Sequence, residues 1–207
     1  MNCEIISLGP IEANCTIVWG EEKKAWIIDP GAQGDKVISF LKANGLEPAL
    51  IIVTHGHFDH IGGIPELQKA YEGLCVHIAK EDEQMLGHPQ NLWEPYYPMI
   101  SKPSPLKADL DDGVVITEGG IAAKIIATPG HTPGGVCVHF ESENILVSGD
   151  TLFAGSCGRT DFPGGDARVL RESLLRLAKL PTVTKVIPGH GSTTTIEIEL
   201  ATNPYLR

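Results

Sequence analysis

A chain of 207 residues with 42% hydrophobic residues can bury a sizeable core, which excludes an intrinsically disordered protein. The net charge of -10, without any run of Lys or Arg, argues against nucleic acid as a partner. No apolar run approaches the roughly 20 residues of a membrane span, and the N-terminus has the pattern of a strand and not of a signal peptide. Five scattered cysteines fit a reducing compartment. We therefore expect one cytoplasmic domain over residues 1–207, with no membrane partner.

Short runs of β-branched and apolar residues predict strands that alternate with amphipathic segments. These runs are residues 4–8, 16–19, 25–28, 50–53, 74–79, 114–117, 121–127, 136–140, 144–148 and 185–187. Helical spacing of apolar residues predicts helices over 35–43, 61–71 and 167–180, the last with Asp166 as its N-cap. Residues 91–105, rich in Pro and aromatic residues, predict a long ordered loop. Since no strict βαβ rhythm is present, we expect two mixed sheets packed together with helices outside.

The densest set of metal-capable side chains follows the predicted strand over residues 50–53. It is the run Thr54-His55-Gly56-His57-Phe58-Asp59-His60. Because residues two apart in extended chain point to the same side, His55 and His57 can converge on one ion. Asp59 and His60 lie where the chain leaves the strand, and a turn there can aim them at a second ion. Imidazole and carboxylate are preferred ligands of Zn²⁺ and its first-row neighbours, so we expect a metal site and not merely a solvated polar loop.

Three later segments share one pattern, an apolar strand followed by a polar residue beside glycine. They deliver His131, Asp150 and His190. Glycine beside each residue permits a tight turn and a close backbone approach to an ion. The combined set suffices for two divalent ions, one taking His55, His57 and His131, the other taking Asp59, His60 and His190. Asp150 can bridge them, because its two oxygens suit ions about 3.5–4 Å apart. Such ligands accept zinc, iron or manganese, of which we expect zinc.

These residues resemble the metallo-β-lactamase superfamily. The matching positions are the HxHxDH run from His55 to His60 and the later His131, Asp150 and His190. The resemblance implies an α/β fold, a four-layer αβ/βα sandwich of two mixed β-sheets with outer helices and the metal site at one edge of the sheets. The chain departs from strict β-lactamases, since Asp150 stands where a cysteine ligand is typical and His60 where they generally have no metal ligand. Residues 149–162 and 203–206 are instead similar to short glyoxalase II-like (hydroxyacylglutathione hydrolase-like) proteins.

That branch implies a metal-dependent hydrolase that cleaves a thioester, such as S-lactoylglutathione, by attack of a metal-bridging hydroxide. Asp59 is a candidate proton relay. Arg159 occupies the position where the family places a basic residue near the glutathione carboxylate, with a surface or structural ion pair as its alternative role. Full-length glyoxalase II continues into a helical C-terminal domain with further glutathione-binding residues, which residues 1–207 lack. We therefore expect a small-molecule thioester as the substrate, with recognition of glutathione left open.

Two other activities use similar ligands. Persulfide dioxygenases have a run similar to residues 157–162 and use one iron held by two His and one Asp, with open positions for O₂. Against this alternative stands His190 in its Pro-Gly-His-Gly setting, which is typical of a functioning second metal site. Lactonases use the same core ligands, and the ligands alone do not separate lactones from thioesters. A closed structural zinc site is disfavoured, because such sites are usually rich in Cys.

Overall fold

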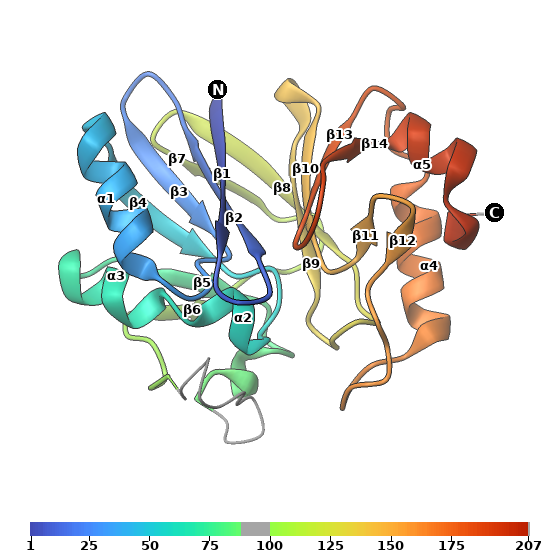
Figure 1. The fold of residues 1–207 in the computed structure, drawn as a ribbon, viewed down its shortest axis with the longest axis horizontal. Coiled ribbons are helices and arrows are strands. Elements are labelled where there is room, and N and C mark those ends of the chain that lie inside the picture. Colours follow the sequence, from blue (N-terminus) through green and yellow to red (C-terminus); the bar gives the residue numbers. More distant parts are fainter. Residues whose placement is uncertain (88–99, 207) are drawn as a thin grey trace.

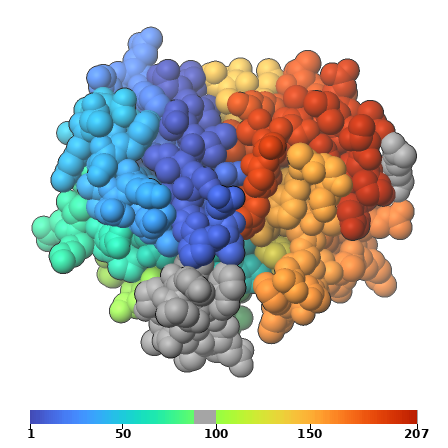
Figure 2. Space-filling model, viewed as in Figure 1, coloured from blue at the N-terminus to red at the C-terminus, as the bar shows by residue number. Residues whose placement is uncertain are grey.

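The computed structural model describes residues 1–87 and 100–206. Two sheets pack face to face, and helices cover their outer sides (Figure 1). The expected αβ/βα sandwich with mixed sheets is confirmed. The first half of the chain forms one side of the molecule and the second half forms the other, as the blue-to-green and orange-to-red regions of Figure 2 show.

The first sheet has the strand order β1-β2-β3-β4-β5-β6. The strands are β1 (Asn2–Leu8), β2 (Ala13–Trp19), β3 (Lys24–Ile28), β4 (Glu47–Ile52), β5 (Val76–Ile78) and β6 (Leu106–Ala108). The first three pair antiparallel, and β3 to β6 pair parallel. Helices α1 (Gly34–Asn44) and α3 (Ile64–Ala70) lie on the outer face, whereas the single turn α2 (Phe58–Ile61) lies at the ends of the strands (Figure 1).

The second sheet has the order β14-β13-β10-β9-β8-β7. Its strands are β7 (Val115–Glu118), β8 (Ile121–Ala127), β9 (Val136–Phe140), β10 (Ile145–Gly149), β13 (Lys185–Pro188) and β14 (Thr194–Thr195). Only β10 and β13 pair parallel among the described strands of this sheet. The hairpin of β11 (Leu152–Phe153) and β12 (Ser156–Cys157) follows β10, and α4 (Ala167–Leu177) and α5 (Ile196–Thr202) cover the outer face. Short 3₁₀ turns span Glu83–Met85, Glu141–Glu143 and Pro204–Leu206.

The sheets meet through a core of buried apolar side chains. Trp26 and Phe140 face each other across it, with ring centroids 5.8 Å apart. On the outer side of the second sheet, α4 buries Leu170, Leu174 and Leu177, which recur at helical spacing on one face. Each sheet is therefore covered on both faces. This packing holds the two sheets in one arrangement, with their strand ends next to each other. No helix in the described ranges is long and apolar enough to cross a membrane.

Two helical predictions had different outcomes. Asp166 caps α4 as predicted, since its carboxylate accepts the N–H groups of Arg168 at 2.8 Å and Val169 at 3.1 Å. The helix predicted over residues 61–71 is found as α3, but it begins later than predicted, because Ile61 belongs to α2 and Gly62 and Gly63 separate the two helices. The break follows from packing: a Cβ on Gly63 would lie 2.5 Å from the carbonyl oxygen of Gly31. The loop predicted over residues 91–105 lies largely outside the described residues.

Candidate metal centre

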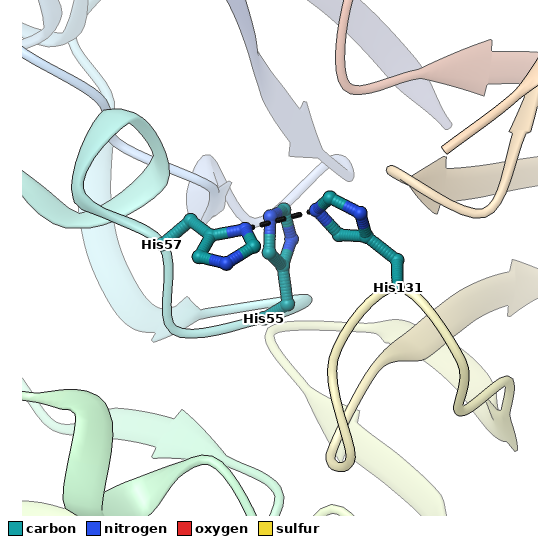
Figure 3. A group of neighbouring side chains, drawn as sticks. All are labelled: His55, His57 and His131. Carbon is teal, nitrogen blue, oxygen red and sulfur yellow. Dashed lines mark hydrogen bonds between the residues drawn. The ribbon is translucent and has the colours of Figure 1, made fainter. Parts of the chain in front are cut away.

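The seven predicted ligands lie together where the strand ends of the two sheets meet. They come from the loop after β4, from α2, from the loop after β8, from the end of β10 and from the turn after β13. His55, His57 and His131 form a first group, whose candidate ligand atoms lie within 4.8 Å of one another. Figure 3 shows their rings pointing toward one another, two from one loop and His131 from the opposite loop. His57 Nδ1 and His131 Nε2 lie 2.9 Å apart.

Asp59, His60 and His190 form a second group of the same compactness. The turn of α2 positions Asp59 and His60, and His190 approaches from the second sheet. Oδ2 of Asp59 lies 3.0 Å from Nε2 of His190 and 3.4 Å from Nε2 of His60. One carboxylate oxygen and two imidazole nitrogens therefore converge on one point, as a second cation would require.

Asp150 lies between the two groups. Its Oδ1 is 3.5 Å from Nε2 of His60, and its Oδ2 is 3.5 Å from Nε2 of His131. Oδ2 also lies 3.8 Å from Nε2 of His190, so the carboxylate stands within reach of both groups, as a bridging carboxylate would. The neighbouring chain must be glycine, because a Cβ on Gly189 would lie 2.1 Å from Oδ1.

Buried polar atoms that make no hydrogen bond indicate whether the site suits a metal ion. Within residues 1–87 and 100–206, His55 Nε2, His60 Nε2 and Asp150 Oδ1 are buried and make no hydrogen bond. Leaving such an atom unpaired costs about 1–3 kcal/mol, so native proteins rarely do so. Divalent cations at the two groups would satisfy these three atoms, because imidazole nitrogen and carboxylate oxygen are their ordinary ligands. The residues present fit a metal centre.

The charge states of the two groups differ. Burial, followed by the nearby imidazole of His131, lowers the pKa of His57 to about 3, and burial together with neighbouring imidazoles lowers that of His55 well below its usual value. Both rings are therefore neutral at pH 7, the form that binds a metal. Burial also lowers the pKa of His60, but the carboxylates of Asp59 and Asp29 outweigh it and raise that pKa well above its usual value. The carboxylates of the second group therefore stabilise a positive charge placed among them.

The other ring nitrogens of the histidines are held by the surrounding chain. His131 Nδ1 donates to the carbonyl of Arg159 at 2.6 Å, and His190 Nδ1 donates to that of Ile11 at 3.1 Å. A carbonyl only accepts, so both rings carry their proton on Nδ1 and direct Nε2 into the centre. Metal-binding histidines nearly always have such an outer partner.

Asp29 is a further member of the site that sequence analysis did not predict. It follows β3 and accepts the Nδ1 proton of His60 at 3.0 Å. Its signal in the sequence was the same as for the ligands, a carboxylate directly after an apolar strand and before Pro30 and Gly31.

The structure places Arg159 at the rim of the centre, in an ion pair. Its Nε and Nη2 each donate to a carboxylate oxygen of Asp161 at 2.6 Å, and its guanidinium carbon lies 4.0 Å from the centroid of the Phe162 ring. That ring is 38% exposed and lies 5.6 Å from the ring of His57. Sequence analysis did not predict Phe162 as part of the site.

Comparison with known proteins decides the family. A family model described as the metallo-beta-lactamase superfamily matches residues 8–190. The chain belongs to the metallo-beta-lactamase superfamily. Within this superfamily it is 34% identical over 209 residues to hydroxyacylglutathione hydrolase GloC of Haemophilus influenzae, a match that covers 100% of this chain and 98% of that protein.

Two solved structures agree with this assignment. The B3 metallo-beta-lactamase BLEG-1 superposes with a TM-score of 0.91 at 34% identity, covering 99% of each chain. TTHA1623, solved in a di-iron-bound form, superposes with a TM-score of 0.81 at 35% identity, covering 98% of this chain and 100% of that one. The expected family and fold are confirmed. Membership and these relatives support a metal-dependent hydrolase that uses divalent metal.

Proposed function

We propose that this protein is a thioester hydrolase of the hydroxyacylglutathione hydrolase type, acting on a substrate such as S-lactoylglutathione with two divalent ions, of which zinc is the first choice. The observation that carries the proposal is the position of Asp150 between the two ligand groups, with Oδ1 3.5 Å from Nε2 of His60 and Oδ2 3.5 Å from Nε2 of His131. The likeness to hydroxyacylglutathione hydrolase GloC over the full chain supports the substrate class. Since both sheets contribute ligands, residues 1–207 act together as one catalytic domain.

In this proposal, the first group would hold one ion and the second group the other, and Asp150 would be a ligand available to both. When bound, two such ions make a water nucleophile available near neutral pH and polarise the thioester carbonyl. Asp59 stays ionised, because the nearby histidines outweigh its burial and lower its pKa, so its Oδ2 is available as an anionic ligand beside His190; as the proton relay expected from the sequence it would act as a weak base. The leaving thiolate needs no acid, since a free thiol has a pKa near 8.5.

Arg159 is the residue we propose for the anionic end of the substrate. Its guanidinium uses two of its five N–H groups on Asp161, so a rigid, charged donor faces the rim. The exposed ring of Phe162 lies between this charge and His57 and offers an apolar surface to the substrate.

The test is a substrate panel run on one preparation with metal analysis. The panel contains S-lactoylglutathione, a small thioester without glutathione, a lactone, a β-lactam, and glutathione persulfide in an oxygen electrode. We expect about two metal ions per chain, as in a two-metal site, thioester cleavage and no oxygen uptake. One iron per chain with oxygen consumption on the persulfide would identify a dioxygenase instead, and preferred cleavage of the lactone or the β-lactam would reassign the substrate.

A further inference from the structure

Asp82 lies behind the first ligand group, between the two loops that carry it. It follows β5 and is completely buried. Its Oδ2 accepts the N–H of Gly56 at 3.0 Å, and its Oδ1 accepts the N–H of Gly134 at 2.6 Å. Gly56 stands between His55 and His57, and Gly134 closes the loop that presents His131. One side chain therefore joins the two segments whose histidines must meet on one ion.

The packing around Gly56 and Gly134 is independent evidence that the two ligand loops meet at Asp82. A Cβ on Gly134 would lie 2.8 Å from Oδ1 of Asp82 and 2.7 Å from its backbone nitrogen. A Cβ on Gly56 would lie 2.7 Å from Cβ of Met85 and 3.2 Å from the carbonyl oxygen of Asp82. The absence of side chains at these two positions thus permits a close approach of both loops to the Asp82 segment.

A carboxylate suits this position better than any other side chain. It offers two acceptor oxygens and no donor, and each oxygen accepts from one backbone N–H group. An asparagine would present one acceptor and one donor, so its amide would face an N–H group without a hydrogen bond. Hydrogen bonds to an ionised acceptor are also about twice as strong as neutral ones.

We propose that Asp82 is a positioning residue that sets the separation of the His55–His57 segment from His131, and with it the metal affinity of the first ligand group. The inference rests on the metal centre of the proposed function. Asp82 contacts neither metal nor substrate in this role; it acts through the backbone of the two loops.

The experiment compares Asp82→Asn with Glu83→Gln. Glu83 is the neighbouring residue, and its carboxylate pairs with Lys102 at 2.7 Å, so the control removes the same charge without touching a ligand loop. Zinc affinity is measured by competition with a chromophoric chelator, and folding of the metal-free proteins by circular dichroism. We expect Asp82→Asn to bind zinc about 10–100-fold more weakly at one of two sites, the usual effect of losing an outer partner. Glu83→Gln should bind as the wild type does.

Two further readouts separate positioning from a merely structural role. Raising the buffered free zinc concentration by the factor lost in affinity should restore turnover of Asp82→Asn. Cobalt substituted at the site should give an altered visible absorption spectrum, because the ligand geometry changes. A variant with a lower melting temperature, wild-type zinc affinity and an unchanged cobalt spectrum would overturn the inference.

Gly134→Ala is the second variant, for the case in which Asp82→Asn does not fold. It keeps the carboxylate but forces it away from the loop of His131, so the same loss of zinc affinity is expected. If the wild-type protein binds no zinc, the proposed function fails. If the wild type binds two ions and the folded variants bind them equally well, the role of Asp82 alone fails.

Discussion

Nδ1 of His60 lies 3.0 Å from Oδ2 of Asp29, and both side chains are almost completely shielded from water. Asp29 also accepts the N–H of Thr54 at 2.7 Å and its hydroxyl at 2.6 Å. Because the Nδ1 proton is directed to Asp29, Nε2 of His60 is directed toward Asp59 and Asp150. A residue that follows β3 thus orients a ligand on α2.

Replacing Asp29 should therefore weaken both the fold and the second ligand group. Asn is the suitable replacement, because Asp29 has a φ of 54°, which Asn tolerates better than Ala does. An amide cannot accept from all three donors, so we expect Asp29→Asn to lower the free energy of unfolding by about 1–3 kcal/mol. Urea denaturation and metal analysis measure the two effects. The exposed Asp35→Asn is the control, and equal metal content in both variants would contradict the predicted role in orienting His60.

Removal of the bridging carboxylate should cost the protein at least one metal ion. Asp150→Ala takes away both oxygens that face the ligand groups, and leaves the histidines of each group without a shared anion. Elemental analysis after dialysis should show a reduced metal content, with turnover lowered in parallel. Asp111→Ala, at an exposed position, should keep the wild-type content. Full occupancy and undiminished turnover of Asp150→Ala would rule out the two-metal centre.

Kinetics on two substrates test Arg159. If its guanidinium binds a substrate carboxylate, Arg159→Ala should raise KM for S-lactoylglutathione about tenfold or more, since a charge-assisted hydrogen bond contributes about 1.5–3 kcal/mol. KM for a small thioester without that carboxylate should stay constant. Asp161→Asn keeps the guanidinium and should not raise either KM. Equal effects of Arg159→Ala on both substrates would leave only the ion pair with Asp161 as the role of Arg159.

The ion pair between Arg159 and Asp161 should make a contribution to stability that depends on pH. The hydrogen bonds from Arg159 lower the pKa of Asp161 to about 2. The folded value lies below the unfolded value of about 3.9, so any stabilisation by the pair is complete above pH 4 and is lost as the pH falls through about 2. A carboxyl NMR titration of Asp161 should show this low pKa in the wild type and a return toward 3.9 in Arg159→Ala. An unshifted titration in the wild type would exclude a stable pair in solution.

The core between the sheets should be sensitive to loss of volume. Phe140 is fully buried against Trp26, so Phe140→Ala should lower the free energy of unfolding by about 3–5 kcal/mol. Val115→Ala, on the second sheet but 59% exposed, should change it by less than about 0.5 kcal/mol. Denaturant unfolding of both variants measures the difference, and similar values would place Phe140 outside the cooperative core.

Local sequence pointed to the candidate ligands because their segments follow apolar strands, and glycine lies beside His55, His57, His131, Asp150 and His190. The paired strands β8 and β9 are found at their predicted bounds for the same reason. Helix α5 is different: its sequence Ile196-Glu197-Ile198-Glu199-Leu200 alternates as a strand would. Tertiary contacts decide for the helix, since buried Glu199 accepts from the N–H of Gly155 and the side chain of Asn203.

Asp82 shows the other limit of local sequence. Nothing in the run around it distinguishes it from Glu81 or Glu83, which are acidic neighbours in the same turn. Its role depends on the two loops that meet on it, one from each sheet, and their meeting is a property of the assembled sandwich. The short strands β6, β11, β12 and β14 escape prediction for a similar reason, because two or three residues carry too little periodicity.

The candidate ligands come from both halves of the chain, and this has a thermodynamic consequence. An ion held by His57 of the first half and His131 of the second would cross-link the two sheets. Metal at a hundred times its dissociation constant adds about 2.7 kcal/mol to the stability of whatever it holds. Removal of the metal by a chelator should therefore destabilise the contact between the sheets before it destabilises either sheet. Backbone amide exchange at residues 54–60 and 128–135 should accelerate first.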